Sequence, residues 1–137
     1  MVTFATPDEA EQAFYAAFEA RSLKAMSEVW ADDDGIVCVH PLGERLVGRR
    51  AVLGSWEQIL ANSPPMRFHR TDIRRSTEGT LAVHTLYENI IVGDDPQPRA
   101  PMPAINVYRL TGQGWRLVVH QASPIHQTAR RGSATVH

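Results

Sequence analysis

The 137-residue sequence has very little cysteine, no long apolar run and almost no net charge. Its single cysteine, Cys38, excludes an internal disulfide and any cysteine-rich metal site. No apolar stretch approaches the ~20 residues of a membrane-spanning helix. The formal charge of −1, from 14 basic and 15 acidic side chains, lacks the electrostatic footprint of a protein that binds nucleic acid or an anionic membrane. We therefore expect neither nucleic acid nor membrane among its partners.

Several short chemical signatures are also missing. The sequence contains no Gly-rich phosphate loop and no G-x-S-x-G nucleophile elbow. The histidines at positions 40, 69, 84 and 120 form no H-x-H or H-E-x-x-H pair, so we expect no metal and no cofactor. Residues 1–9 lack the basic and then apolar pattern of a signal peptide, and we expect a cytoplasmic location.

The first half of the chain has the pattern of helices. Thr6 is a suitable N-cap, Pro7 fits the first helical position, and Glu9 completes a capping box. Phe14 and Phe18 then share the apolar face of this first helix. The sequence therefore predicts a helix that begins at Pro7.

Two further helices are predicted downstream. Ser22 can cap a short second helix with Trp30 on its apolar stripe. Arg49–Ala61 forms the third, with Trp56 on its apolar face, and the sequence N-S-P-P ends it. Between these two helices, a short β-branched strand over Ile36–Val39 leads directly to His40.

The second half of the chain changes to β-rich segments separated by hairpin-length connections, which implies antiparallel pairing. The predicted strands are Met66–Ser76, Thr80–Val92, Ala104–Leu110 and Trp115–Ser123. Helices followed by a four-stranded meander, with one early strand added, indicate a single α+β domain over residues 1–123. The polar tail at 124–137 is expected to be partly disordered.

The order of these features resembles the NTF2-like superfamily, which includes ketosteroid isomerase and the SnoaL-type polyketide cyclases. The resemblance covers residues 8–123, and the motifs C-V-H-P-L-G-E-R-L-V-G-R and V-V-H-Q-A-S-P are most similar to its uncharacterised SnoaL-like branch. It implies a cone in which three N-terminal helices pack on a curved antiparallel sheet around an apolar pocket. It also implies a homodimer formed through the outer face of the sheet.

The same resemblance assigns candidate residues. The catalytic Asp of ketosteroid isomerase, at the end of the first strand, corresponds to His40. The oxyanion-hole Tyr corresponds to Phe14, or to Tyr15 if the register slips by one residue, and the protonated Asp of that hole corresponds to Asn106. Relative to ketosteroid isomerase, the base is therefore an imidazole (His40) instead of a carboxylate, and the carboxylic acid of the oxyanion hole is replaced by an amide (Asn106).

His40 and Asn106 are the candidate catalytic residues. An imidazole with an unperturbed pKa near ~6.5 can take or give a proton at neutral pH. Asn106 shares a strand face with Tyr108, and an amide and a phenol can together hold a substrate carbonyl. The structural alternatives are a histidine that bonds a backbone carbonyl at a strand end, an asparagine that satisfies a neighbouring backbone group, and a packed Tyr108.

The pocket wall is expected to be aromatic. Phe14, Trp30 and Trp56 lie on apolar helix faces. Trp56 is the favoured ligand contact of the two tryptophans, because the third helix flanks the cone in the family that the chain resembles. The alternative is that these side chains form a filled core.

Strand alternation sets the remaining candidates. In the last strand, Arg116 and His120 are four residues apart and so share one face, which the charge of Arg116 suggests is the outer one. We therefore predict that His120 faces the dimer side and that Gln121, on the opposite face, lines the pocket. His84 and Glu88 are four apart and share a face, which we expect to be the outer one. If that face were the interior, Glu88 would need a partner, which His84 or a second histidine on the preceding strand could supply.

Three functions are compatible with these features. The first is a cofactor-free enzyme in which His40 acts as general acid or base on a small apolar carbonyl compound and Asn106 polarises the oxygen, in isomerisation, cyclisation or dehydration. The second is a non-catalytic module that binds an apolar ligand in the same pocket. The third is a dimeric association domain whose pocket is a filled core.

Overall fold

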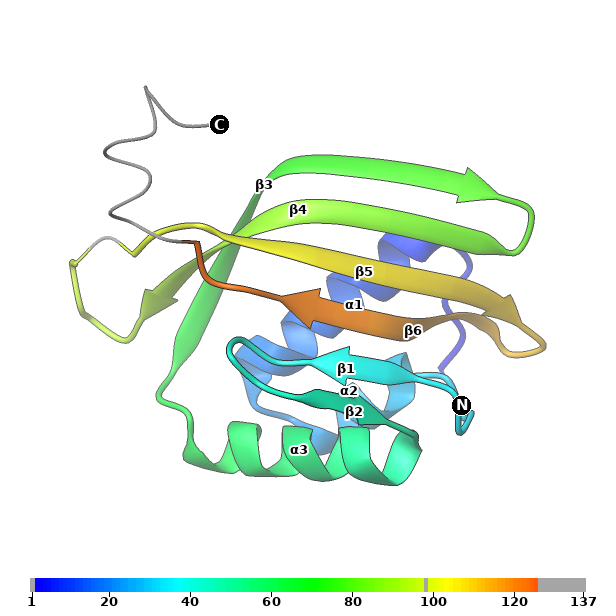
Figure 1. The fold of residues 1–137 in the computed structure, drawn as a ribbon, viewed down its shortest axis with the longest axis horizontal. Coiled ribbons are helices and arrows are strands. Elements are labelled where there is room, and N and C mark those ends of the chain that lie inside the picture. The colour runs from blue at the N-terminus through cyan, green and yellow to red at the C-terminus, as the bar shows by residue number, and fades with distance from the viewer. Residues whose placement is uncertain (1, 98, 126–137) are drawn as a thin grey trace.

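The computed structural model describes residues 2–97 and 99–125. Three helices, α1 (Pro7–Ala20), α2 (Leu23–Val29) and α3 (Arg49–Asn62), pack with one six-stranded sheet (Figure 1). The strands are β1 (Val37–Val39), β2 (Arg45–Val47), β3 (Met66–Glu78), β4 (Leu81–Val92), β5 (Met102–Thr111) and β6 (Gly114–Ala122). The tail that the sequence predicts to be partly disordered lies outside the described residues from position 126 onward. No helix within the described ranges is long and apolar enough to cross a membrane.

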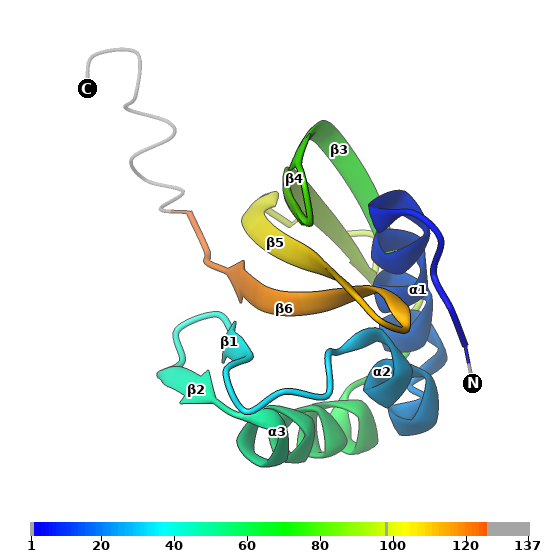
Figure 2. The same ribbon diagram turned by 90° about the vertical axis from the view of Figure 1, so that its right-hand side faces the viewer.

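The sheet confirms the predicted α+β class. Its strand order is β2-β1-β6-β5-β4-β3, and β3 to β6 form the expected antiparallel meander. The strand β1 pairs parallel with β6, so the sheet is mixed rather than purely antiparallel. Figure 2 shows the sheet curving, with α1 against one of its faces. The end of β1, where His40 follows, is thereby placed beside the central strand β6.

The predicted helix caps are present. The Thr6 hydroxyl accepts a hydrogen bond from the Glu9 amide at 3.1 Å, and the Glu9 carboxylate accepts one from the Ala5 amide at 2.9 Å. The Ser22 hydroxyl accepts one from the Ala25 amide at 3.1 Å. These bonds satisfy amides that have no partner inside the helix, so the sequence determines where α1 and α2 begin.

A β-bulge in β6 reverses the alternation that the sequence suggests. The register with β5 shifts at Val118, which is an extra residue. Leu117, four residues before Gln121 and therefore on the same face in a regular strand, is fully buried, but beyond the bulge the two faces exchange. His120 is 2% exposed on the helix side, whereas Gln121 is exposed on the outer face. The predicted orientations of Gln121 and His120 are therefore reversed.

A second bulge lies in β3. The register with β4 shifts between Thr71 and Arg74, and Asp72 in the bulge has a φ of 49°. Two residues five apart in a regular strand point to opposite faces, but the extra residue brings Arg70 and Arg75 to the same face. Both arginines can therefore reach the helix α1.

The core between the helices and the inner sheet face is aromatic. The Trp56 ring lies edge-on to Phe14, at a centroid distance of 5.6 Å, and to Phe18, at 4.9 Å. The Phe18 ring also lies 4.5 Å from Phe68 on β3. Such edge-to-face pairs add to the free energy gained by burying the rings. The cluster joins α1, α3 and the sheet beside the residues predicted to be functional.

Candidate functional site

His40 lies at the edge of this aromatic cluster. Its ring is half-buried and stands edge-on to Trp56, at a centroid distance of 4.8 Å. Its Nε2 lies 2.9 Å from the hydroxyl of Ser55 on α3. That hydroxyl donates its one proton to the Val52 carbonyl at 2.7 Å, so it must accept from Nε2–H of His40. The lone pair of the neutral ring is therefore on Nδ1, and burial lowers the pKa of His40, which favours that neutral form.

Cys38 is the nearest sulfur to this imidazole. Its Sγ lies 3.6 Å from Nε2 of His40. Burial raises the pKa of the Cys38 thiol to about 12, so the thiol stays protonated at neutral pH. Because the thiolate is the nucleophilic form, Cys38 has the role of a small buried side chain.

Four buried polar side chains from four different elements form one continuous series of hydrogen bonds, which we call the Glu88 chain. Nδ1 of His120 (β6) lies 2.5 Å from Oδ1 of Asn106 (β5). The Asn106 amide donates to the Tyr15 hydroxyl (α1) at 3.1 Å, and that hydroxyl donates to Oε2 of Glu88 (β4) at 2.7 Å. All four residues are buried. The family resemblance left Phe14 or Tyr15 as the counterpart of the oxyanion-hole tyrosine. Of these two residues on α1, Tyr15 supplies the phenol of the Glu88 chain.

The Glu88 chain contains an acid with an unusual pKa. Burial raises the pKa of Glu88 to about 7, and the hydrogen bond from Tyr15 opposes this only in part. Burial, and then the neighbouring Glu88, raise the pKa of Tyr15 well above its ordinary value. Burial and the nearby His40 lower the pKa of His120 to about 3. At neutral pH, His120 and Tyr15 are therefore neutral, and Glu88 is the member that titrates.

A second buried group, the Glu11 cluster, also joins α1 to the sheet. The Glu11 carboxylate is fully buried, 2.7 Å from Nδ1 of His84, and it accepts hydrogen bonds from Arg75 at 3.0 Å and from Arg70. Burial alone would raise the pKa of Glu11. The hydrogen bonds from His84 and Arg75 and the two guanidinium charges outweigh that effect and lower the pKa to about 2. Glu11 is therefore permanently ionised and compensated.

The positions of His84 and Glu88 differ from the sequence prediction. Both lie on the inner, helix-facing side of β4 rather than on the outer face. Their partners are Glu11 and Tyr15, both on α1, rather than each other or His69. The sequence offered one signal for this arrangement: the acid and the phenol on α1 are four residues apart, as the histidine and the acid on β4 are.

The other predicted ligand contacts are buried. Phe14 packs on His120 with ring centroids 4.8 Å apart, and Trp56 lies 6.1 Å from the same imidazole. Tyr108 shares the inner face with Asn106, and its ring lies against the imidazole of His84. The Tyr108 hydroxyl has no hydrogen-bond partner within the described part of the chain. Over residues 2–97 and 99–125, no group of three or more His, Cys, Asp or Glu side chains is arranged to hold a metal ion.

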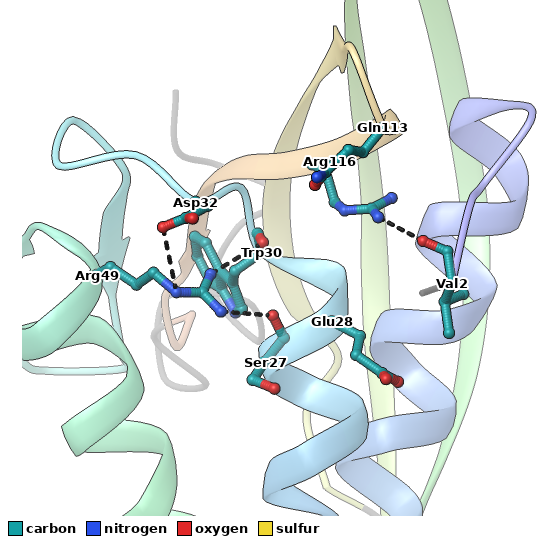
Figure 3. Close-up of a pocket in the computed structure, with 8 residues that line it drawn as sticks. All are labelled: Val2, Ser27, Glu28, Trp30, Asp32, Arg49, Gln113 and Arg116. Atoms are coloured by element: carbon teal, nitrogen blue, oxygen red, sulfur yellow. Dashed lines mark hydrogen bonds and ion pairs between the residues drawn. The ribbon is translucent and has the colours of Figure 1, made fainter.

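Trp30 lies apart from the His40 site, beside a surface pocket of about 440 Å³ (Figure 3). The pocket is lined by Val2, Ser27, Glu28, Trp30, Asp32, Arg49, Gln113 and Arg116. Arg116 donates to the backbone carbonyl of Val2 across it. The expectation that Trp30 and Trp56 line one common pocket therefore has no counterpart in this arrangement.

Arg49 in this pocket has a structural role that the sequence did not reveal. Its guanidinium donates to the carbonyls of Ser27 at 2.9 Å, Trp30 at 3.1 Å and Ala31 at 3.0 Å. These are carbonyls at the end of α2, which have no partner inside the helix. The Gly-Arg motif that opens α3 thus caps the preceding helix.

Solved structures with this arrangement belong to the NTF2-like proteins. A protein of Streptomyces avermitilis, provisionally named a dehydratase of the NTF2-like family, is 36% identical, covers 88% of this chain and 99% of its own, and has a TM-score of 0.77. A protein of Thiobacillus denitrificans, provisionally named a calcium/calmodulin-dependent protein kinase type II association domain, is 40% identical, covers 92% of this chain and 100% of its own, and has a TM-score of 0.87. The fold is therefore NTF2-like.

The comparison with family models identifies one family within this fold. The model of the SnoaL-like domain matches residues 8–127, and the chain belongs to that family. The F-box protein SKIP8 of Arabidopsis thaliana is 26% identical over 112 residues, which are 80% of this chain and 46% of that protein. The chain thus spans about half the length of this curated relative.

Proposed function

We propose that this protein is a cofactor-free enzyme that moves a proton on a small apolar carbonyl compound, in isomerisation, cyclisation or dehydration. The observation that carries the proposal is a pair of imidazoles, His40 and His120, that both lie close to the Trp56 ring and whose pKa values burial lowers. The centroid distances to the Trp56 ring are 4.8 Å for His40 and 6.1 Å for His120. Pairs of titratable groups in an apolar setting are typical of acid–base sites.

His40 acts as the general base in this proposal. Its Nε2–H is held by Ser55, so the lone pair is on Nδ1, which lies 3.9 Å from Sγ of Cys38. This lone pair takes the proton from the carbon next to the substrate carbonyl. The bond to Ser55 persists after proton uptake, because both nitrogens of an imidazolium are donors. Half-burial keeps the ring neutral before the reaction.

His120 takes the role that the sequence assigned to Asn106. The Asn106 amide already bonds Tyr15 and His120, so we assign it to positioning the imidazole rather than to touching the substrate. Nε2 of His120, the ring nitrogen that does not face Asn106, then meets the substrate oxygen. It accepts from a substrate hydroxyl when it has the lone pair and donates to a carbonyl oxygen when it carries the proton. The provisional name of the Streptomyces avermitilis relative supports dehydration among the possible reactions.

The test is turnover by the purified protein on a panel of small hydroxycarbonyl and enolisable carbonyl compounds. His40→Ala should lower kcat by about 10²–10⁴-fold on any compound that is turned over. The matched control is His69→Ala, since His69 is exposed on β3 and should leave the rate unchanged. Equal rates in the two variants would overturn the assignment of His40, and binding without turnover would favour the non-catalytic module.

We also propose a homodimer formed through the outer sheet face. This face carries exposed apolar side chains, and the provisional name of the Thiobacillus denitrificans relative is that of an association domain. The residues are Leu81, Val83, Tyr87, Ile91 and Ile105. Light scattering should give twice the monomer mass, and Ile105→Lys should give the monomer mass. A wild-type monomer would overturn this proposal.

A further inference from the structure

We infer that Glu88 controls the tautomer of His120 through Tyr15 and Asn106, so that proton uptake at Glu88 converts Nε2 of His120 from a hydrogen-bond acceptor into a donor. The role of this change in ligand choice rests on the proposed function. The change itself is a property of the protein without ligand and can be measured there.

The observed contacts give the Glu88 chain a direction. Glu88, when ionised, only accepts, so the Tyr15 hydroxyl donates to it. The Tyr15 oxygen then accepts from the Asn106 amide nitrogen, which leaves Oδ1 of Asn106 turned toward His120. Nδ1 of His120 must therefore carry the proton, and Nε2 has the lone pair. The ionised carboxylate is the only member that cannot donate, so it sets the direction of all the bonds.

Protonation of Glu88 reverses this direction. A carboxylic acid has a hydroxyl that needs an acceptor. Among the described residues, the side chain that is hydrogen-bonded to Glu88 is that of Tyr15, so its oxygen is the acceptor at hand. When Glu88 donates to the Tyr15 oxygen, the Tyr15 proton turns to Asn106. The Asn106 amide then rotates by half a turn, so that Oδ1 accepts from Tyr15 and the amide nitrogen donates to Nδ1 of His120. Nδ1 must then carry the lone pair, which places the proton on Nε2.

The proton count of this change is simple. One proton enters from solvent and stays on Glu88. His120 loses its Nδ1 proton and gains one on Nε2 by exchange with water, so its ring remains neutral throughout. Rotation of the Asn106 amide exchanges two groups of nearly equal size, so the packing around the buried amide is kept.

The charged surroundings allow Glu88 to titrate. Arg70 is its register partner on β3, but that guanidinium bonds Glu11 on α1 and lies 5.0 Å over the Tyr15 ring. Met102 is the register partner on β5 and carries no charge. His84, on the same strand, is bonded to the Glu11 carboxylate.

Burial, and to a smaller extent the nearby His40, lower the pKa of His120 to about 3. Burial raises the pKa of Glu88 to about 7. Near neutral pH, Glu88 therefore changes charge while the His120 ring does not. A change of tautomer in this range can have its origin at Glu88 but not in protonation of His120 itself.

The consequence is a choice between two ligand groups at Nε2. With Glu88 ionised, the lone pair on Nε2 accepts a hydrogen bond from a hydroxyl or takes its proton. With Glu88 protonated, Nε2–H donates to a carbonyl or an enolate oxygen. Nε2 of His120 would thus favour a hydroxyl-bearing compound above the pKa of Glu88 and a carbonyl compound below it.

The experiment is a ¹⁵N NMR titration of the ligand-free wild-type protein with labelled histidine rings, from about pH 5.5 to about pH 8.5. The shifts of Nδ1 and Nε2 distinguish the two neutral tautomers from an imidazolium. We expect the two nitrogens of His120 to exchange their shifts with a midpoint near pH 7 and without an imidazolium. One tautomer throughout the range, or an imidazolium at His120, would overturn the inference.

Two tyrosine variants locate the coupling. Tyr15→Phe removes only the hydroxyl that joins Glu88 to Asn106, so the His120 tautomer should become independent of pH. Tyr87→Phe removes the same atom from the outer side of β4 and should keep the exchange. An exchange that survives in Tyr15→Phe would overturn the proposed route.

Glu88→Gln should also abolish the exchange, which provides a second variant if Tyr15→Phe does not fold. The outcome is separable from the proposed enzyme activity. An exchange of tautomers without turnover on any compound would keep this inference and remove the catalytic proposal. Loss of turnover in His40→Ala, with a single His120 tautomer at every pH, would do the reverse.

Discussion

The Glu11 cluster and the Glu88 chain both join α1 to β4, at neighbouring positions along the two elements. Glu11 and Tyr15 are four apart on α1, and His84 and Glu88 are four apart on β4. Each pair of facing positions buries one glutamate between helix and sheet. Yet the pKa of Glu11 is lowered to about 2, whereas that of Glu88 is raised to about 7.

The difference teaches that burial alone does not decide the charge of a carboxyl group. Glu11 has two guanidinium partners in addition to a histidine, and their charges outweigh the cost of burial. Glu88 has one phenol, which compensates for burial only in part. The first glutamate holds the helix on the sheet with a fixed charge, and the second is available for proton chemistry.

The largest effect should come from removing the fixed charge. Glu11→Gln takes the ionised partner from Arg70, which is half-buried, and from Arg75, which is more exposed and keeps a 3.7 Å contact with Asp8. Because an ion pair with a buried carboxylate is then broken on one side, the free energy of unfolding should fall by about 3–5 kcal/mol. Urea unfolding at pH 7 measures it. Glu57→Gln, an exposed position on α3, is the control and should change stability by less than about 0.5 kcal/mol. A loss below about 1 kcal/mol in Glu11→Gln would mean that the Glu11 cluster does not stabilise the packing of α1 on the sheet.

The second effect depends on pH. The folded protein raises the pKa of Glu88 from 4.5 to about 7, so folding favours the protonated acid. This contribution is fully present below about pH 4.5 and is lost as the pH rises through about 7; a change of this size corresponds to about 3 kcal/mol. Glu88→Gln should therefore match the wild type near pH 4 and exceed its stability by up to about 3 kcal/mol at pH 8.

Unfolding free energies across this pH range measure the difference. The fixed charge should behave in the opposite way, because Glu11 has a lowered pKa: its contribution is present above about pH 4.5 and is lost as the pH falls through about 2. A Glu88→Gln variant that is equally stable relative to the wild type at pH 4 and pH 8 would contradict the assigned pKa of Glu88.

The smallest effect sharpens the role of the phenol. Tyr15→Phe removes one buried hydrogen bond and should lower the free energy of unfolding by about 1–2 kcal/mol. Because the Tyr15 hydroxyl lowers the pKa of Glu88, its loss should also move that pKa further upward. The carboxyl ¹³C shift of Glu88 measures this change. In the Tyr87→Phe control the pKa of Glu88 should not move, and an equal shift of that pKa in both variants would remove the direct role of Tyr15.

Local signals explain why much of the fold could be predicted from the sequence. The caps at Thr6 and Ser22 are contained in a few neighbouring residues, and both are present. Turn-separated β-rich segments correctly predicted the antiparallel meander. The parallel pairing of β1 with β6 depends on the path of the chain between distant segments, and no local pattern encodes it.

The candidate site was harder to predict because its geometry depends on two bulges. One extra residue at Val118 brings His120 inside and Gln121 outside, against simple alternation. Another, at Asp72, lets two arginines reach Glu11 from the same face of β3. His40, at the end of a short strand, needed no such correction, since its place follows from the strand itself. The roles of the buried glutamates became clear only once their partners from distant strands were known.

The most direct test of the central claim is a ¹³C NMR titration of the Glu11 and Glu88 carboxyl groups in one sample of the wild-type protein. The account predicts that the Glu88 carboxyl titrates near pH 7 and that the Glu11 carboxyl stays ionised down to about pH 2. If both carboxyl groups titrated together near the ordinary value of 4.5, the division between a fixed charge and a proton-exchanging acid would be contradicted.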